Sequence, residues 1–480
     1  MTTLFCFLIS FLVQSQLDFD RIPDVVQKAL ERGDSEVNIH LEKGVYFYGD
    51  QFLGINGVEA PDVSLSISGE DAVLVASDGG NRDYSPAKGY VDLRALRHRD
   101  IRGPMRNTYF WPMKVPFRKN LYRIRCVDTP DNLRPETTIL LTQWYVGAAY
   151  PVEKITPTHI YFRREKKYET RMLSELRYGR CMPRYRLRNA PADTSLYGCS
   201  AVRFLTVGNT TLRSLSLEGL HFLGNGEGDW MIRLSGLTAD SVQVSRCRFE
   251  GLRSGAVYFE KTDSLLVEGN EFRDCYKSCI YIKSTCHDAL VQGNRFFNNG
   301  LAISNAPVVN CKGDRFLIRD NYFEDFAYSA IGLGHHYAEK DTCGVRGVVE
   351  RNEICMSPSF RKGVFATLID SGAIYVWTKN NGLVIRDNYI HDIDGPHGNR
   401  GILCDDGACN VQIYGNRVFR VRGSYCIDLR MFRRVRWMMD ERKFLPNSGN
   451  VMRDNVVDGR CRFHIRRSDP TSVKGKNVHL

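Results

Sequence analysis

The sequence predicts an all-β fold, a right-handed parallel β-helix that carries a small inserted β domain. Three observations lead to this prediction. A short asparagine-containing phrase recurs after about residue 200, the residues around it alternate with strand periodicity, and no helical periodicity of comparable length occurs there. Self-similarity with a period in the twenties or thirties indicates a solenoid in which each repeat forms one coil.

The asparagine phrase reads "VEGNEF", "VQGNRF", "IRDNYF", "VERNEI", "IRDNYI", "IYGNRV" and "MRDNVV" in successive copies. Apolar residues lie two apart on both sides of the asparagine, which predicts two strands joined at a bend. An inward-facing amide at the same bend of each coil can hydrogen-bond the coils above and below it. The steps between copies vary from 24 to 39 residues, so insertions are expected at other corners. The asparagines are Asn270, Asn294, Asn321, Asn352, Asn388, Asn416 and Asn455.

A further strand of each coil, which precedes the asparagine phrase, can be aligned from coil to coil by its distance from the asparagine. Ile280, Ile374 and Ile402 each lie 14 residues before the asparagine of their coil, and Val257 lies 13 before Asn270. The longer coils supply Ile331 in "SAIGLGHH" and Ile427 in "YCIDLR". We therefore expect these six residues to form one column that faces the core.

Residues one and three places after each core residue should then face outward, because side chains alternate along a strand. A face of aromatic, acidic and basic side chains predicts a groove for a sugar chain, which is polar but has flat apolar faces. An ordinary exposed sheet, whose aromatic residues reflect β-propensity, is the alternative. The outward set is Tyr258 and Glu260, Tyr281 and Lys283, Gly332 and Gly334, Tyr375 and Trp377, Leu403 and Asp405, and Asp428 and Arg430.

The rest of the chain divides into further segments. Residues 1–16, "MTTLFCFLISFLVQSQ", are uncharged, apolar and too short to cross a bilayer, which predicts a secretory signal peptide, with a buried N-terminal helix as the alternative. Residues 17–87 are predicted to form an N-terminal cap and the first coils. Residues 88–198 lose the asparagine phrase and predict an inserted, sandwich-like β domain, which either adds a wall to the groove or is structural. The main solenoid is predicted over 199–470, followed by a C-terminal tail at 471–480.

Composition limits the compartment and the partners. The signal peptide predicts a secreted or periplasmic protein with no membrane insertion. The chain has 15 cysteines, for which disulfides and buried thiols are both open, and their spacing does not indicate zinc. The net charge of +11 is compatible with acidic glycans, nucleic acid or anionic surfaces, or simply with a solvated basic surface. No nucleic-acid motif accompanies it, so no nucleic-acid partner is expected.

Two adjacent acids, Asp405 and Asp406, end a strand in "RGILCDDGACNVQIYGN". Neighbouring carboxylates repel each other unless something uses or compensates them. Asp428 lies on the next coil and Asp370 opens the strand of the previous one. Coils are about 4.8 Å apart, and glycoside hydrolysis needs two carboxyl groups about 5 Å apart for retention or about 6.5–9.5 Å apart for inversion. A solenoid can therefore supply a pair at either separation.

The phrases "GDRFLIRDNYFEDF", "DSGAIY", "IRDNYIHDI" and "GILCDDGACNVQIYGN" resemble right-handed parallel β-helix repeat proteins of the pectate-lyase-like superfamily. Similar members include β-helix glycoside hydrolases of the β-xylosidase and α-L-fucosidase type with an inserted β-sandwich. The resemblance implies aspartate catalysis in the groove, and the positions that match are Asp370, Asp405 and Asp406. This chain has Leu403 and Cys404 where the family usually has "GIYLDDG", which leaves the substrate class open.

Three functions follow as alternatives. The first is a glycoside hydrolase that acts on a polysaccharide or oligosaccharide, without a cofactor and as a monomer, with Asp370, Asp405 and Asp406 as catalytic residues. The second is a polysaccharide lyase, with Lys283 or Arg430 as the base and acids that hold Ca²⁺. The third is a non-catalytic glycan-binding solenoid. The predicted substrate-binding residues are Glu260, Lys283, His335, His336, Tyr375, Trp377, Asp428 and Arg430.

Overall fold

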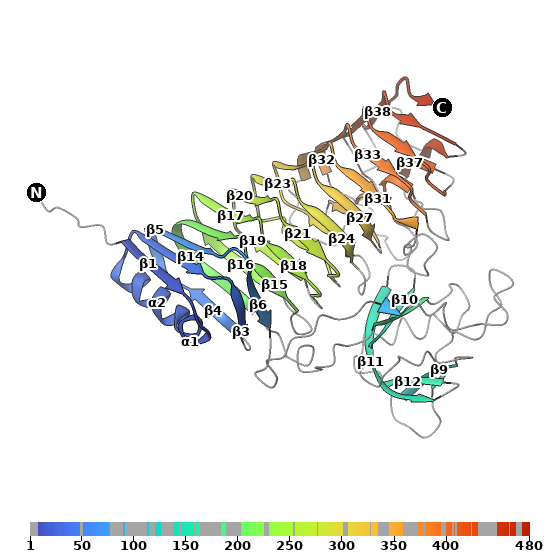
Figure 1. Ribbon diagram of the computed structural model, residues 1–480. Coiled ribbons are helices and arrows are strands. Elements are labelled where there is room, and N and C mark those ends of the chain that lie inside the picture. Colours follow the sequence, from blue (N-terminus) through green and yellow to red (C-terminus); the bar gives the residue numbers. More distant parts are fainter. Residues whose placement is uncertain are drawn as a thin grey trace, which may run out of the picture.

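The computed structural model describes residues 8–48, 51–76, 90–91, 113–114, 121–125, 138–143, 146–156, 159–163, 184–188, 203–224, 230–252, 255–275, 277–300, 306–326, 328–334, 345–358, 372–377, 380–394, 400–405, 408, 410–423, 425–430, 449–459, 461–466 and 473–480. Within these ranges the chain is a solenoid of short parallel strands, and an antiparallel sheet is inserted after its first coils (Figure 1). The predicted all-β class, parallel β-helix and inserted β domain are confirmed.

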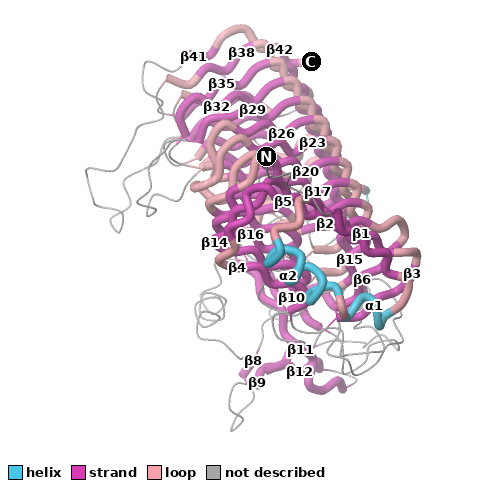
Figure 2. Tube along the Cα trace, turned by 90° about the vertical axis from the view of Figure 1, so that its left-hand side faces the viewer, coloured by secondary structure: helices cyan, strands magenta, loops and turns pink. Residues whose placement is uncertain are grey.

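Two helices cover the N-terminal end of the solenoid (Figure 2): α1 (Gln16–Asp20) and α2 (Ile22–Arg32). A proline in the first turn of α2 fixes a helical φ, and Gly33 ends the helix with a φ of 71°. Buried residues recur on one side of α2 with helical spacing, so its apolar face closes the open end of the core. They are Ile22, Val26, Ala29 and Leu30.

The first coils are built from one strand that precedes the two helices in the sequence and from five strands that follow them. β1 pairs in parallel with β2 over six residues, and Val13 of β1 is fully buried. Part of the segment predicted as a signal peptide therefore lies in the first strand; its cleavage and export stay predictions. The strands are β1 (Leu8–Val13), β2 (Glu36–Leu41), β3 (Gly44–Tyr48), β4 (Gln51–Asn56), β5 (Glu59–Ser68) and β6 (Ala72–Ala76).

The inserted sheet has seven described strands in the order β7-β13-β10-β11-β12-β9-β8. The described strands of this sheet pair antiparallel, unlike those of the solenoid. The strands are β7 (Tyr90–Val91), β8 (Met113–Lys114), β9 (Leu121–Arg125), β10 (Thr138–Gln143), β11 (Val146–Thr156), β12 (His159–Arg163) and β13 (Arg184–Arg188).

The main solenoid has three sides. β14 (Arg203–Glu218) runs along the first two sides, because it pairs with both β16 and β17. The first side continues through β16 (Trp230–Thr238), β19 (Gly255–Glu260), β22 (Ile280–Ile282), β25 (Val309–Cys311), β28 (Ile331–Leu333), β31 (Gly372–Val376), β34 (Arg400–Cys404), β37 (Tyr425–Arg430) and β40 (Arg462–Arg466).

The second side consists of β17 (Ser241–Ser245), β20 (Leu265–Glu268), β23 (Ala289–Gln292), β26 (Phe316–Arg319), β29 (Val345–Glu350), β32 (Asn380–Arg386), β35 (Val411–Tyr414), β38 (Val451–Arg453) and β41 (Val473–Lys474). The third side continues β3 and β6 with β15 (His221–Leu223), β18 (Arg248–Glu250), β21 (Glu271–Arg273), β24 (Arg295–Asn299), β27 (Tyr322–Phe326), β30 (Glu353–Cys355), β33 (Tyr389–His391), β36 (Arg417–Phe419), β39 (Val456–Val457) and β42 (Val478–His479).

The core between these sides is a stack of equivalent residues from successive coils. On the third side a column of five phenylalanine rings runs through five coils, and Phe204 of β14 contacts its first ring, with centroids 4.4–5.0 Å apart throughout. This separation follows the spacing of the strands, so each ring contacts the ring of the next coil. The column is Phe222, Phe249, Phe272, Phe296 and Phe323.

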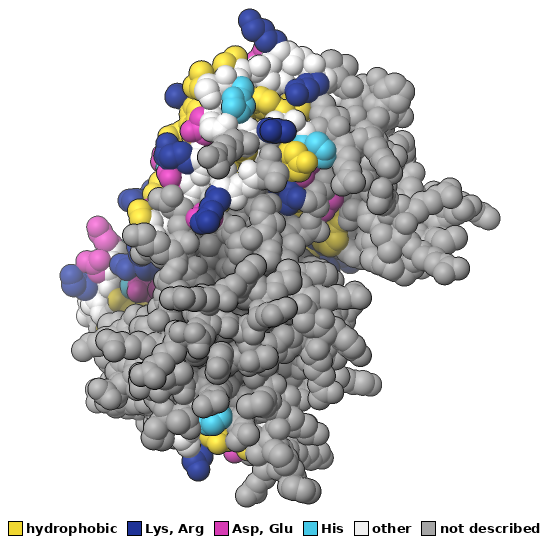
Figure 3. Space-filling model, turned by 90° about the vertical axis from the view of Figure 1, so that its right-hand side faces the viewer, with side chains coloured by type: hydrophobic (Ala, Val, Ile, Leu, Met, Phe, Trp, Pro, Cys, Tyr) yellow, Lys and Arg dark blue, Asp and Glu magenta, His cyan; other side chains and the backbone are white. Residues whose placement is uncertain are grey.

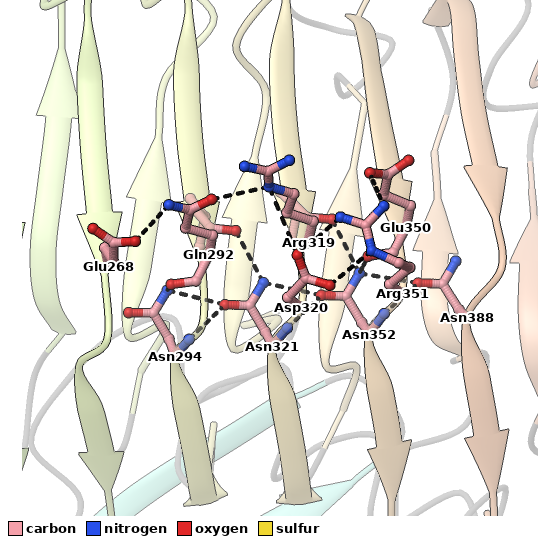
Figure 4. A network of polar contacts seen from close by, with 12 residues as sticks. Glu268, Gln292, Asn294, Arg319, Asp320, Asn321, Glu350, Arg351, Asn352 and Asn388 are labelled. Atoms are coloured by element: carbon pink, nitrogen blue, oxygen red, sulfur yellow. Dashed lines mark hydrogen bonds and ion pairs between the residues drawn. The ribbon is translucent and has the colours of Figure 1, made fainter.

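The predicted asparagine ladder is present at the corner between the second and third sides (Figure 4). The Oδ1 atom of Asn352 accepts from the backbone N–H of Asn321 at 3.1 Å and from its Nδ2 at 2.9 Å. The Nδ2 atom of Asn352 donates to Oδ1 of Asn388 and to the carbonyl of Ile318. Each asparagine thus satisfies backbone groups that the bend would otherwise bury unpaired.

The residue before each asparagine has a left-handed backbone. Gly269 has a φ of 65° and Asp320 a φ of 56°. Glycine adopts this region without strain, and aspartate tolerates it better than most residues, which explains the "GN" and "DN" pairs of the phrase.

The ladder continues past the predicted end of the solenoid. The backbone N–H of Asn455 donates to Oδ1 of Asn477 at 3.1 Å. β41 and β42 pair with β38 and β39, so residues 473–480 belong to the last coil. The predicted tail from residue 471 is therefore corrected, because "KGKN" repeats the asparagine bend in a form without the flanking apolar pattern.

Beside the asparagines, the outer surface of the second side carries alternating charges (Figure 4). Glu350 is 4% exposed and pairs with Arg351 at 2.5 Å and with Arg386 at 2.5 Å. Burial raises the pKa of Glu350, but the two guanidinium groups outweigh it and hold the pKa below its ordinary value. These pairs cross from coil to coil, and we assign them to structure.

Replacement of Asn352 by alanine tests the ladder. The variant leaves the buried N–H and amide of Asn321 without their acceptor, so we expect a loss of roughly 2–5 kcal/mol in the free energy of unfolding. Denaturant unfolding measures this loss, with Asn38→Ala on β2 as the control for a partly exposed asparagine. Equal stability of the two variants would contradict the assigned role.

Candidate functional site

The first side of the solenoid has the register that the sequence predicts. Val257 pairs with Ile280, and Ile331, Ile374, Ile402 and Ile427 follow one another in the same column. All six residues of this column are fully buried. The residues between them therefore face outward on neighbouring coils, and we call the outer surface of β16, β19, β22, β25, β28, β31, β34 and β37 the β16–β37 face.

Facing outward does not mean exposure on this face. Tyr375 is 6% exposed, and Leu403 and Asp428 are 0% exposed. Tyr375, Leu403 and Asp428 are paired in register, so each side chain lies about one strand spacing from the next. The prediction of an open outward face is wrong for this end of the face, where the side chains are buried.

At the other end, three aromatic rings form a cluster. Trp230 lies 5.4 Å from Tyr258 and 5.8 Å from Tyr281 between ring centroids, and the two tyrosines stack at 5.6 Å. The guanidinium of Arg233 lies over Tyr258 at 5.2 Å, and Nζ of Lys312 lies 5.8 Å from the centre of Tyr281. The cluster combines flat rings with cations, an arrangement suited to a polar ligand that has apolar faces.

Glu260 joins this cluster through its carboxylate. Its Oε2 accepts from the hydroxyls of Ser235 at 3.0 Å and Tyr258 at 3.2 Å, and Oε1 lies 3.3 Å from Nζ of Lys283. Burial raises the pKa of Glu260, but these contacts outweigh it and hold the pKa below its ordinary value. Glu260 is therefore ionised at neutral pH.

The pKa of Lys283 is shifted in the opposite direction to that of Glu260. Burial lowers its pKa, yet the charges and hydrogen bonds of Tyr258 and Glu260 raise the pKa above its ordinary value. A lysine in this state carries its proton at neutral pH. It can bind an anion or a hydroxyl, but it has no free lone pair with which to abstract a proton.

Asp405 lies directly after β34. Its Oδ2 accepts from the hydroxyl of Tyr375 at 3.3 Å, and its backbone N–H donates to the carbonyl of Val376 at 2.9 Å. Burial raises the pKa of the Cys404 thiol, and the charges of Asp428 and Asp405 raise it further. Asp405 comes two residues after Leu403, which pairs with Asp428, so the two acids lie on adjacent coils two positions apart along the strand.

Asp428 is held by protein groups on both oxygens. Nε of Arg400 lies 2.6 Å from Oδ2, and Nδ1 of His464 lies 2.7 Å from Oδ1. The imidazole of His464 also stacks on Tyr425 at 4.1 Å. The prediction that Asp428 binds substrate is therefore corrected: its full burial makes it an anchor between coils.

The predicted site residues fall into separate groups. Glu260 and Lys283 meet at the aromatic cluster, whereas Tyr375, Trp377 and Asp405 lie together near β34. Five strand steps separate Glu260 from Asp405, about 24 Å along the face. Asp370, Asp406, His335 and His336 lie outside the described residues, as does the side chain of Arg430.

Sequence reasoning did not find several of the residues that complete these groups. Arg233 and Lys312 lie on the coils before and after the tyrosines, and the register column contained the signal for Arg233, which pairs with Tyr258. His464 likewise pairs with Asp428 in the register of β37 and β40, so extending the column by one coil would have found it. Arg400 lies two residues before Ile402 on the preceding coil and does not pair with Asp428 in register.

Comparisons with known proteins agree with this architecture. The family model described as "Right handed beta helix region" matches residues 194–338. Among solved structures, one described as a glycoside hydrolase aligns with 98% of this chain and 96% of its own, at 14% identity and a TM-score of 0.53.

The chain folds as a right-handed parallel β-helix. This agrees with the resemblance to such proteins that the sequence phrases carry.

Two further solved structures match the chain with lower TM-scores and lower sequence identity. A mutant tailspike protein of E. coli bacteriophage HK620 in complex with a pentasaccharide is 10% identical, with coverage of 97% of this chain and 62% of its own and a TM-score of 0.33. The family 28 exopolygalacturonase of Yersinia enterocolitica is 12% identical, with coverage of 98% and 78% and a TM-score of 0.26. No curated protein sequence matches the chain.

Two kinds of site were sought and not found in the described part of this β-helix. No group of three or more His, Cys, Asp and Glu side chains among the described residues is arranged to hold a metal ion. None of the described helices is both long and apolar enough to cross a membrane.

Replacement of Glu260 by glutamine tests the charge of the aromatic cluster. Because the folded pKa is below the ordinary value of about 4.3, the stabilisation by Glu260 is complete above that pH and is lost as the pH falls through the folded pKa. Unfolding free energies should differ by about 1 kcal/mol at pH 7 and converge in acid. A difference that grows as the pH falls would contradict this assignment.

Replacement of Asp428 by leucine tests the anchor. The variant leaves Arg400 buried without its partner, so we expect a loss of about 3–5 kcal/mol in unfolding free energy. The double variant with Arg400→Met removes both charges and should be more stable than the single variant. If the single variant were as stable as the wild type, Asp428 would not be an anchor.

Proposed function

We propose that this β-helix binds a glycan along the β16–β37 face and hydrolyses it there. The observation that carries the proposal is the aromatic cluster at Glu260. It combines the stacked rings of Tyr258 and Tyr281, the edge of Trp230, and an ionised Glu260–Lys283 pair on adjacent coils. Stacked rings fit the apolar faces of sugars, and the charged groups fit their hydroxyls.

Asp405 is the catalytic acid that we propose, together with Asp370 and Asp406 from the sequence. Asp405 accepts a hydrogen bond from the hydroxyl of Tyr375 on the neighbouring coil, and on the next coil Asp428 pairs with Leu403, two residues before Asp405. In a hydrolase one acid protonates the leaving oxygen while another attacks or activates water. Both oxygens of Asp428 are held by protein groups, the guanidinium of Arg400 and the imidazole of His464, which favours Asp370 or Asp406 as the second catalytic group.

A hydrolase fits the site better than a lyase. The raised pKa of Lys283 keeps this residue protonated, so it is a poor base for proton abstraction. The solved structure that shares the fold over nearly the whole chain is described as a glycoside hydrolase, which makes hydrolysis the first reaction to test.

Export belongs to the same proposal. A disulfide joins Cys426 on β37 to Cys461 before β40. Disulfides persist in oxidising compartments, which favours the secreted or periplasmic location expected from the N-terminal sequence. Seven other described cysteines are buried thiols that burial protects from reaction.

A glycan-binding solenoid without catalysis is the second candidate. One observation favours it: Asp405 is only 6% exposed, so a substrate reaches its carboxylate only if the surroundings open. The two candidates share the aromatic cluster and differ in whether a product forms.

Incubation with a panel of polysaccharides and oligosaccharides tests the proposal. We expect reducing ends to appear without an ultraviolet-absorbing unsaturated product, and a chelator should leave the rate unchanged. An unsaturated product that disappears with the chelator would identify a lyase. Binding without any product would identify the solenoid as a glycan-binding protein.

Asp405→Asn should lower the rate by about 100- to 10,000-fold, because the amide neither donates a proton nor attacks. The exposed Asp240→Asn on the same solenoid is the matched control and should keep full activity. Tyr375→Phe removes the hydroxyl that Asp405 accepts and should reduce the rate less. Full activity in Asp405→Asn would remove this residue from the mechanism.

A further inference from the structure

The positive charge of the chain is concentrated in the inserted region between β6 and β14. Residues 77–202 contain 24 Lys and Arg against 12 Asp and Glu. The whole chain contains 66 against 55, so the remaining 354 residues contain 42 basic and 43 acidic residues. The solenoid is close to neutral, and the insert carries the excess.

The described strands of the insert concentrate this charge further. They contain eight basic residues and one acidic residue, Glu153. A sheet with this composition creates a positive potential that attracts anionic polymers. The basic residues are Lys114, Arg123, Arg125, Lys154, Arg163, Arg184, Arg186 and Arg188.

Strand register brings basic and aromatic positions together. In the β9–β12 pair, Arg123 is opposite Tyr161 and Arg125 is opposite His159. The rings of His159 and Tyr161 are partly exposed, with centroids 6.1 Å apart. In β13, arginines occupy the alternate positions 184, 186 and 188, which share one face of a strand.

Arginines on the solenoid form ion pairs with acidic side chains of the same coil or of neighbouring coils. Arg351 pairs with Asp320 and Glu350, and Arg420 pairs with Asp392. The solenoid side chains visible in Figure 3 show basic and acidic groups interspersed. Paired charges of this kind stabilise neighbouring coils. The described strands of the insert, with eight basic residues and one acidic residue, carry a net positive charge that an anionic ligand can neutralise.

We propose that the inserted sheet is a second binding surface and that it binds an acidic glycan, a sugar chain that bears regularly spaced carboxylate or sulfate groups. Arginine forms paired hydrogen bonds with such groups, and the aromatic positions suit the sugar rings between them. The choice of a glycan over another polyanion rests on the proposed function, but binding at the insert does not require hydrolysis.

The β16–β37 face is compatible with the same ligand. At the aromatic cluster Arg233 lies over Tyr258, Lys312 lies over Tyr281, and Lys283 pairs with Glu260. This part of the solenoid therefore also combines cations with aromatic rings, the combination that suits an acidic sugar chain.

The test measures the affinity of the full-length chain for polygalacturonate, a sulfated glycan, neutral dextran and duplex DNA at low and high salt. The triple variant R184Q/R186Q/R188Q removes three charges from the insert. The matched control R32Q/R246Q/R422Q removes three charges from solenoid arginines whose side chains are 55%, 69% and 81% exposed. The variant R184K/R186K/R188K keeps the charge and controls for folding.

We expect the insert variant to bind an acidic glycan at least about tenfold more weakly, while the solenoid control changes by less than about twofold. The lysine variant should retain most of the affinity, high salt should weaken binding, and dextran should not bind. Preference for polygalacturonate or for the sulfated glycan identifies the anionic group.

Equal losses in the two arginine-to-glutamine variants would overturn the proposal, because net charge alone would then explain binding. Tighter binding of duplex DNA than of either acidic glycan would also overturn it. The binding measurement needs no turnover, so a chain that binds an acidic glycan through the insert and releases no reducing ends would support this inference and contradict only the proposed hydrolysis.

Discussion

The structure depends on the satisfaction of backbone polar groups at the bends between coils. Each bend turns the chain inward, where its N–H and carbonyl groups have no access to water. The asparagine ladder supplies their partners, and each amide bonds the coils on both sides, as Asn352 does with Asn321 and Asn388. The asparagines are 0–2% exposed, so an unpaired amide there would carry its full desolvation cost. This requirement fixes the position of every coil relative to the next.

Fixed register determines which residues meet. Once the bends are aligned, a residue pairs with the residue at the same position of the next coil, whatever the length of the loop between them. Leu403 and Asp428 are neighbours for this reason, although 25 residues separate them in sequence. The same rule creates the charge ladder on the second side and the aromatic cluster on the first. The two differ because the second side alternates acids with guanidinium groups, whereas the aromatic cluster combines the Glu260–Lys283 pair with two cations that lie over tyrosine rings.

The sequence predicts the register of the coils well because the ladder uses one residue type, asparagine, at the same bend of successive coils. The spacing of 14 residues between isoleucine and asparagine was enough to align Ile374 with Ile402, and the pairing agrees. Burial was not predictable in the same way. Alternation gives the direction of a side chain, but Asp428 is buried because Arg400 and His464 approach it from the two adjoining coils. His464 pairs with Asp428 in register, but Arg400 does not, and an alternating pattern within one strand does not show that side chains from two other coils cover a carboxylate.

Asp405 and Asp428 differ in their surroundings, and the difference indicates separate roles for the two acids. Asp405 follows β34 and Asp428 lies on β37, so the two acids stand on adjacent coils, and Asp405 is two residues beyond Leu403, the residue that pairs with Asp428. Asp405 accepts from the hydroxyl of Tyr375, whereas Asp428 contacts a guanidinium and an imidazole. Because Arg400 lies on the coil before Asp428 and His464 on the coil after it, the contacts of Asp428 join three coils. Asp428 therefore holds the coils together beneath this end of the face, and the role that we propose in catalysis falls to Asp405 at the end of its strand.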